Sequence, residues 1–199
     1  MATNTPSRPT LMLVIASTRP QRAGKPLADW LTTVIADHGA FAIDVADLKE
    51  IDLPMMDEPE HPMLGRYVHD HTKQWSARVA AADAFVMVTP EYNHSFTAPL
   101  KNAIDYLNRE WKSKPVAIAS YGGVSAGLRA ATMLRAVLSA LGMVATGTTV
   151  SIPMIKTFLS PEREFQANEV VTKAATGMLD ELLTLHRALS PLREPVAIG

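Results

Sequence analysis

The sequence contains no cysteine. Disulfide bonds, thiolate catalysis, cysteine-ligated zinc and iron–sulfur clusters are therefore excluded, because each of them requires a thiol. Any redox chemistry would have to come from a bound organic cofactor. No apolar run approaches the roughly 20 residues of a membrane-spanning helix, and the polar first ten residues lack the apolar core of a signal peptide. We therefore expect a cytoplasmic protein without membrane contact.

The chain also lacks a surplus of charge of either sign. Its 19 Lys and Arg residues nearly balance 20 Asp and Glu residues, for a formal net charge of −1. Proteins that bind nucleic acid or a membrane surface usually carry a basic excess, so neither partner is expected. The only dense basic cluster comprises Arg19, Arg22 and Lys25. Its small extent indicates a local anion site.

The chain contains a regular alternation of short apolar runs with longer helical patterns. Its 199 residues, without repeat, low-complexity segment or linker, predict one domain over 10–190 between a disordered tail over 1–9 and a tail over 191–199. Strands are expected at 11–16, 41–45, 84–89, 115–120 and 143–152, and helices at 25–38, 68–82, 97–111, 128–141 and 161–189. The proline-containing stretch over 48–65 is expected to be a long surface loop.

Strands that alternate with helices predict right-handed βαβ units. We expect an α/β fold with a doubly wound, five-stranded parallel sheet in the order 2-1-3-4-5 and helices on both faces. In that order, ligands bind beyond the carboxyl ends of the strands, at the switch point between strands one and three. Three loops would border this site, over residues 17–25, 90–96 and 121–126.

The first loop reads STRPQRAGKP over residues 17–26. Its hydroxyl and guanidinium groups meet the free N–H groups of a starting helix at the end of the first strand. This combination suits a phosphate dianion. The loop matches neither the Walker pattern nor the GxGxxG dinucleotide pattern, which favours a mononucleotide phosphate over ATP or NAD. A polar surface turn that caps the helix remains the alternative.

The second loop reads TPEYNHS over residues 89–95. It places an aromatic ring and an amide beside the expected crevice. A flavin ring system needs an aromatic or apolar face and polar groups at its pyrimidine edge, so this composition suits one. The alternative is a loop that starts a helix, with Asn93, Ser95 or Thr97 as the cap.

The third loop reads YGGVSAG over residues 121–127. It contains GxSxG between a strand and a helix, which matches the nucleophile elbow of serine hydrolases with Ser125 as the nucleophile. Such a hydrolase also needs an acid and a histidine at later strand ends. The candidates Asp180 and His186 instead fall in the last helical segment. The glycines are better explained by a close approach of the backbone to a flat ligand.

Three histidines, His61, His69 and His71, raise the question of a metal site. His69 and His71 are two residues apart on a predicted helix, so they would not share a face, and the HExxH pattern is absent. We expect solvated histidines and no metal.

Four segments together carry a resemblance: STR at 17–19, PEYN at 90–93, LKNAID at 100–105 and YGG at 121–123. They strongly resemble the NADPH-dependent FMN reductase family of flavodoxin-like proteins, over about residues 10–155. That family includes quinone, chromate and azo-dye reductases. The resemblance implies a flavodoxin-like fold, FMN as cofactor, NADPH or NADH as hydride donor, and a quinone, flavin or similar small molecule as acceptor. It requires no side chain as catalytic acid or base.

The resemblance also implies which residues bind FMN. The phosphate would be held by Ser17, Arg19, Arg22, Gly24 and Lys25, and the isoalloxazine and ribityl chain would be lined by Pro90, Glu91, Tyr92, Asn93, Ser120, Tyr121, Gly122 and Gly123. Many relatives have glycine where this chain has Ala16. The region after about Ile155 matches no pattern that we can place.

Two interpretations from other classes stay open besides the reductase. One is a flavodoxin-type electron carrier without NAD(P)H activity of its own, although such carriers are often strongly acidic and this chain is not. The other is the serine hydrolase with Ser125.

The helix expected over 128–141 carries apolar residues on more than the one face that would cover a sheet. Together with the resemblance, this predicts a homodimer or homotetramer.

Overall fold

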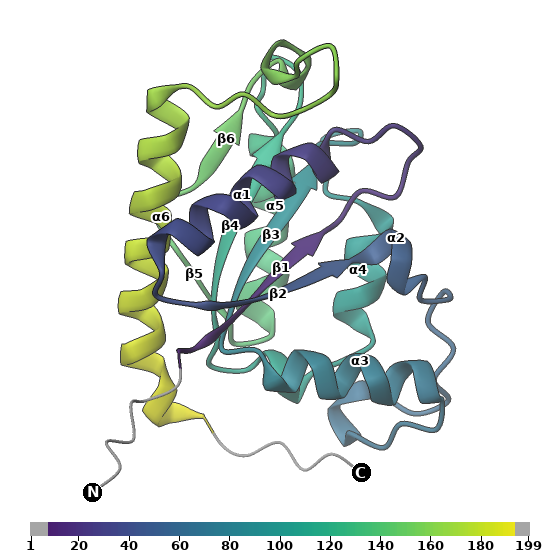
Figure 1. Ribbon diagram of the computed structural model, residues 1–199. Helices are drawn as coiled ribbons and strands as arrows, with labels where there is room; N and C mark the ends of the chain where they lie inside the picture. Colours follow the sequence, from purple (N-terminus) through teal and green to yellow (C-terminus); the bar gives the residue numbers. More distant parts are fainter. Residues whose placement is uncertain (1–7, 194–199) are drawn as a thin grey trace, which may run out of the picture.

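The computed structural model describes residues 8–193, and its centre is a parallel β-sheet. The strands are β1 (Thr10–Ile15), β2 (Ala42–Asp47), β3 (Ala84–Pro90), β4 (Pro115–Tyr121), β5 (Val144–Ala145) and β6 (Val150–Ile152). Their order is β2-β1-β3-β4-β5, and β6 also pairs with β4. All of these pairings are parallel. The predicted α/β fold and strand order are therefore confirmed (Figure 1).

Helices cover both faces of the sheet. They are α1 (Gly24–His38), α2 (Leu48–Ile51), α3 (Asp70–Ala81), α4 (Ala98–Asp105), α5 (Leu128–Ala140) and α6 (Glu169–Leu189), with short 3-10 helices at Pro62–Leu64, Arg109–Trp111, Ile155–Phe158 and Ser190–Leu192. Helices α1 and α6 pack on one face, and α3, α4 and α5 pack on the other. The sheet is thus the middle layer of three.

The sequence of β1 explains this layering. Its side chains point alternately to the two faces of the sheet. Leu11, Leu13 and Ile15 pack against α1 and α6, whereas Met12 and Val14 pack against the helices of the other face. A strand that is apolar at every position must be buried on both faces. The continuous apolar run therefore requires two helical layers.

The fifth position of the sheet differs from the expected single strand over 143–152. It consists of the two short strands β5 and β6, separated by residues 146–149. The carboxylate of Glu181, on α6, accepts hydrogen bonds from the backbone N–H groups of Gly147 at 2.7 Å and Thr148 at 2.8 Å. These amides are therefore taken out of the sheet, which interrupts the strand.

The helix expected over 97–111 ends earlier, at Asp105. The indole N–H of Trp111 donates to the carbonyl oxygen of Ile104 at 3.1 Å. This bond satisfies one of the carbonyls that a helix end leaves unpaired. A side chain seven residues further along the chain thus bonds the end of the helix in place of a next turn.

The last helix begins at Glu169, and the prediction of helix from residue 161 onward is wrong for its first eight residues. Asn168 caps the helix, because its side-chain oxygen accepts from the N–H of Val171 at 2.9 Å. An asparagine in this position is a strong helix start. The segment before it forms part of the candidate site.

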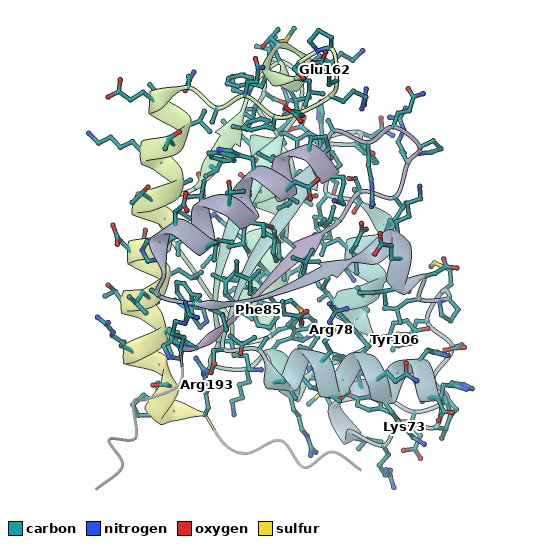
Figure 2. All side chains as sticks on the ribbon, viewed as in Figure 1. Lys73, Arg78, Phe85, Tyr106, Glu162 and Arg193 are labelled. Carbon is teal, nitrogen blue, oxygen red and sulfur yellow. The ribbon has the colours of Figure 1, made fainter. Side chains whose placement is uncertain are left out.

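The long loop over 48–65 is fixed to α4. The amide of Asn102 donates to the carbonyl oxygen of Pro54 at 2.6 Å, and the hydroxyl of Tyr106 donates to the carboxylate of Asp57 at 2.9 Å. Tyr106 lies beside this loop in Figure 2. The LKNAID string therefore has a structural role, since its Asn102 anchors this segment, which itself contains α2 and the 3-10 helix at Pro62–Leu64.

The chain ends were predicted as tails over 1–9 and 191–199, and most of both lies outside the described residues. Within the described part, Arg193 donates to the carboxylate of Asp83 at 2.7 Å. The domain boundaries at residues 10 and 190 stay a prediction. Among residues 8–193, no helix is both long enough and apolar enough to cross a membrane.

Lys114 is a buried cation in the core, at the start of β4. Its side-chain amino group donates to the carbonyl oxygens of Val79 at 2.8 Å and Ala80 at 3.0 Å, at the end of α3. The residue is only 5% exposed. Burial lowers the pKa of Lys114 to about 8.

This lowered pKa predicts how stability depends on pH. An unfolded lysine titrates near 10.4, so between about pH 8 and 10 the unfolded chain binds more protons and the folded state gains stability as pH rises. Relative to Lys114→Met, the unfolding free energy of the unmodified protein should rise by about 2 kcal/mol from pH 7 to 9.5. Urea denaturation at both pH values measures this. A difference that does not change with pH would show that Lys114 titrates normally.

Candidate functional site

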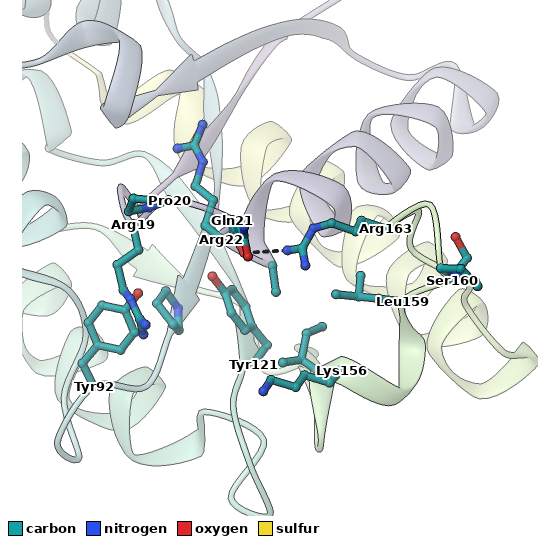
Figure 3. Close-up of a pocket in the computed structure, with 14 residues that line it drawn as sticks. Arg19, Pro20, Gln21, Arg22, Tyr92, Tyr121, Lys156, Leu159, Ser160 and Arg163 are labelled. Atoms are coloured by element: carbon teal, nitrogen blue, oxygen red, sulfur yellow. Dashed lines mark hydrogen bonds between the residues drawn. The ribbon is translucent and has the colours of Figure 1, made fainter.

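A pocket of about 600 Å³ lies at the carboxyl ends of the strands, beside the N-terminus of α1 (Figure 3). Its walls come from the loop after β1, the ends of β3 and β4, and the segment after β6. The lining residues are Arg19, Pro20, Gln21, Arg22, Ala23, Pro90, Tyr92, Tyr121, Ile155, Lys156, Leu159, Ser160, Pro161 and Arg163. The pocket therefore occupies the switch point between β1 and β3, where ligands of this fold class bind.

Arg22 fixes the loop after β1. Its guanidinium donates to both carboxylate oxygens of Asp47, at the end of β2, and to the carbonyl oxygen of Ser17. The side chains of Arg22 and Asp47 are 9% and 4% exposed. This buried, two-pronged ion pair has the geometry that makes arginine–carboxylate contacts strong. The charge expected to face a phosphate is therefore compensated by Asp47.

Lys25 and Glu91 are not among the lining residues of the pocket. Lys25 pairs with Asp29 one turn further along α1, at 2.5 Å. Glu91 pairs with Arg129 at 2.5 Å, at the start of α5. Burial alone would raise the pKa of Glu91, but hydrogen bonds from Arg129 and Ser125 hold it below its usual value. Both side chains are thus engaged elsewhere.

Ser17, Gly24 and Tyr121 pack together, and of the three only Tyr121 is among the residues that line the pocket. The Ser17 hydroxyl is fully buried beside the Tyr121 hydroxyl, yet it forms no hydrogen bond of regular geometry. A Cβ atom on Gly24 would collide with both hydroxyls. The absence of that atom leaves room for the two polar groups, and Ser17 keeps bonding capacity for a ligand atom.

The pocket has an excess of positive charge. Within the described part of the chain, Arg19, Lys156 and Arg163 line it without a carboxylate partner, and no acidic side chain is among the lining residues. The N-terminus of α1 adds to this field, since Ala23 at the cap position gives no side-chain bond and the first turn contains no acidic residue. Free N–H groups and cations together suit a phosphate dianion.

The second predicted loop is a tight turn. Tyr92 and Ser95 exchange two backbone hydrogen bonds, of 2.8 and 3.0 Å. Asn93 and His94 between them both have positive φ, 49° and 69°, as in the two-residue turns of β-hairpins. The turn directs the Tyr92 ring toward the pocket, where the guanidinium carbon of Arg19 lies 5.8 Å from its centroid. Asn93 is not among the lining residues.

The cap that starts α4 is Thr97. Its hydroxyl accepts from the N–H of Leu100 at 3.4 Å and donates to the carbonyl oxygen of Ala16 at 2.8 Å. The alternative interpretation of the second loop is thus correct about Thr97. This capping role and the presentation of Tyr92 coexist in one segment.

The third predicted loop supports the pocket through hydrogen bonds to neighbouring backbone. Ser120 is buried and its hydroxyl donates to the carbonyl oxygen of Ala126 at 2.9 Å. The carbonyl oxygens of Gly122 and Gly123 accept from the backbone of the segment after β6, at 3.1 and 2.9 Å. Only Tyr121 of this loop lines the pocket. The glycines therefore join two loops of the site.

The serine-hydrolase alternative lacks its partners. Ser125 lies in a turn before α5, and its expected acid and base are both on α6. Asp180 instead contacts the ring of His38 at 3.2 Å, and the His186 ring contacts Arg193 at 3.0 Å. Among residues 8–193, neither partner expected for Ser125 contacts it, so this alternative gains no support.

The histidines form a stacked pair. His69 precedes α3 in extended conformation, so its ring stacks on that of His71 with centroids 5.2 Å apart. The expectation that they lie on different faces is wrong, because it placed both on the helix. Across the described residues, no three His, Asp or Glu side chains form a group that could hold a metal ion.

Sequence reasoning missed the segment after β6. It contributes Ile155, Lys156, Leu159, Ser160, Pro161 and Arg163 to the pocket wall. Residues 158–165 form a hairpin, with Leu159 and Phe165 paired as an antiparallel bridge. Its only sequence signal is Pro161 between Phe158 and Phe165, which favours a turn between two apolar anchors.

Comparisons with known proteins agree with this geometry. The sequence model of the family described as NADPH-dependent FMN reductase matches residues 9–157. An NAD(P)H-dependent FMN reductase of Schizosaccharomyces pombe is 34% identical over 194 residues, covering 94% of this chain and 94% of that relative. A probable NADPH:quinone oxidoreductase of Oryza sativa is 32% identical over 120 residues, 58% of this chain and 54% of that relative.

The fold also matches solved structures. FerB, a flavoenzyme NAD(P)H:(acceptor) oxidoreductase from Paracoccus denitrificans, superimposes with a TM-score of 0.74 at 22% identity. The superposition covers 91% of this chain and 98% of that one. At this identity the likeness bears on the fold alone.

The packing at Gly24 predicts a specific sensitivity. Gly24→Ala should lower the unfolding free energy by about 1–3 kcal/mol, because a Cβ there forces the Ser17 and Tyr121 hydroxyls apart. Gly123→Ala is the matched control, since a Cβ at Gly123 meets no atom within 4 Å. Thermal and urea unfolding of both variants measure the effect. Equal stability losses in the two would contradict the role of Gly24.

Proposed function

We propose, since the chain belongs to the NADPH-dependent FMN reductase family, that the pocket beside α1 is its FMN site. The chain is an FMN-dependent NAD(P)H oxidoreductase. In the proposal, Arg19, the N-terminus of α1 and the Ser17 hydroxyl hold the phosphate, and Pro90, Tyr92 and Tyr121 line the ribityl chain and ring. The observation that carries it is the uncompensated positive charge at the switch point.

The chain's own residues would bind and orient, because FMN when bound supplies the hydride acceptance and the electron transfer. Burial raises the pKa of Tyr121 to about 12, so its hydroxyl keeps its proton and can donate a hydrogen bond. Glu91 is ionised and paired with Arg129. Neither residue is placed to move a proton at neutral pH, which fits a site that needs no catalytic acid or base.

The acceptor is proposed to be a small molecule such as a quinone or a flavin. The name of the rice relative, a quinone oxidoreductase, supports this class. The electron-carrier alternative gains no support from the comparisons. The cytoplasmic location expected from the sequence stays a prediction.

The function predicts a two-electron reaction at one site. The protein should bind one FMN per chain, and NADPH or NADH without oxygen should bleach the flavin absorbance in a single step. Initial rates with a quinone should give parallel double-reciprocal lines, since donor and acceptor use one pocket in turn.

The Ser125→Ala variant should keep its turnover number, whereas a serine hydrolase would lose several orders of magnitude in turnover without its nucleophile. If NAD(P)H does not bleach the bound FMN, the reductase function is refuted and the electron-carrier interpretation takes its place.

We also propose a homodimer or homotetramer that forms through α5. The side chains of Ala130, Ala131, Leu134 and Leu138 are buried against the sheet. On the outer side, Leu128 and Met133 are 52% and 54% exposed. A single exposed apolar residue is normal on a protein surface, whereas several on one helix support an interface.

Light scattering at micromolar concentration tests the assembly. It should report at least twice the 21.6 kDa chain mass. Met133→Glu should shift the protein toward the monomer, because a charge would be buried in the interface. Met55→Glu, which changes an exposed methionine of the loop beside α4, should not. A monomer of the unmodified protein would refute the proposal.

A further inference from the structure

The loop after β1 brings too little free charge to a phosphate. Of its basic residues, Arg22 is paired with Asp47 and Lys25 with Asp29. Only Arg19 is without a carboxylate partner within the described chain. A phosphate monoester carries about −1.5 to −2 at neutral pH. Arg19 and the N-terminus of α1 together leave part of this charge unbalanced, and a second cation near the loop would balance it.

We propose that Arg163 is this second cation, and that it binds the FMN phosphate from the opposite wall of the pocket. The inference rests on the proposed function and adds a residue to it. It assigns a role to the C-terminal region of the chain, which the family match, ending at residue 157, does not reach.

The hairpin that carries Arg163 is firmly held. The Phe158 and Phe165 rings stack with centroids 5.7 Å apart and an angle of 9° between their planes. Trp30, on α1, packs against Phe165 with ring centroids 5.1 Å apart. Glu162, next to Arg163, lies near the end of the molecule opposite Arg193 in Figure 2. The aromatic contacts thus attach the hairpin to the helix whose N-terminus faces the pocket.

Arg163 reaches from this hairpin to the loop after β1. Its Nη2 atom donates to the carbonyl oxygen of Gln21 at 2.5 Å (Figure 3). Gln21 lies three residues before α1 begins. The positive charge of Arg163 therefore lies close to the N-terminus of that helix. A guanidinium has five N–H donors, and one bond leaves others for a phosphate.

Arg163 also remains uncompensated among residues 8–193, although Glu162 and Glu164 flank it in the sequence. Neither glutamate forms an ion pair with it or lines the pocket. Arg19, near Tyr92, and Arg163, near Leu159, lie on opposite sides of Tyr121 in Figure 3. A phosphate between them would be bound from two walls.

The test compares FMN with riboflavin, which lacks only the phosphate. Arg163→Ala should raise the dissociation constant for FMN by about tenfold or more and leave that for riboflavin unchanged within about twofold. Arg19→Ala serves as a benchmark with the same signature. Lys173→Ala, which removes one charge from the exposed side of α6, should change neither constant. Fluorescence titration of the apoprotein measures all four proteins.

Two further variants distinguish the effect of the Arg163 charge from that of its hydrogen bond to Gln21. Arg163→Gln keeps a donor for the Gln21 carbonyl without the charge, and should lose FMN affinity as Arg163→Ala does. Arg163→Lys keeps the positive charge and should retain most of the FMN affinity. Thermal unfolding of each apoprotein checks that the hairpin still folds. Full FMN affinity in Arg163→Gln would show that Arg163 only ties the hairpin to the loop, and would overturn the proposal.

Other outcomes are also decisive. Equal losses for FMN and riboflavin would overturn the proposal, because they would place Arg163 against the common part of the ligands. An increase in KM for NADPH but not NADH, with unchanged FMN affinity, would assign Arg163 to the donor's 2′-phosphate instead. Failure of the unmodified protein to bind FMN would refute the proposed function itself. Retained FMN binding with an unchanged preference over riboflavin in Arg163→Ala would refute this inference alone.

Discussion

The buried ion pair of Arg22 and Asp47 is the interaction on which the site depends. It joins the loop after β1 to the end of β2, and the same guanidinium holds the carbonyl oxygen of Ser17. Breaking one partner of such a pair leaves an uncompensated buried charge, which costs about 3–5 kcal/mol. The pair therefore fixes the path of the loop and the place where α1 begins. The contacts of Arg19 with Tyr92 and of Arg163 with Gln21 both depend on that path.

The position of α1 then determines what the pocket can bind. Its first residue, Gly24, packs under the hydroxyls of Ser17 and Tyr121, so the helix start lies against the end of β4. No side chain caps the N-terminus of α1, so the positive end of the helix dipole is not neutralised there. An arginine that looks like a ligand in the sequence thus acts as a support. Because Arg22 pairs with Asp47 and Lys25 with Asp29, Arg19 is the cation of this loop that has no carboxylate partner among residues 8–193.

The sequence predicted the parts of the fold that depend on local pattern. The fully apolar run of β1 required two helical layers, and strands alternating with helices gave the strand order and the edge where ligands bind. The pairing of distant side chains could not be predicted from the sequence, because Asp47 and Glu181 meet their partners only once the sheet is formed. The same limit explains why Arg22 was expected to be free and why the strand over 143–152 was expected to be continuous.

The hairpin over 158–165 shows the same limit in the pocket itself. Its shape depends on Trp30, more than 120 residues away in the sequence, and its link to Gln21 is equally distant. Arg19, Lys156 and Arg163 repel one another when no anion lies between them, and water in the open pocket only weakens this repulsion. In the proposed arrangement, a phosphate bound between the two walls would reverse this repulsion, and its binding energy would also stabilise the arrangement of loop and hairpin. Under the proposal, phosphate affinity and the position of the hairpin over 158–165 would therefore be coupled, and a pattern confined to the first loop does not contain that coupling.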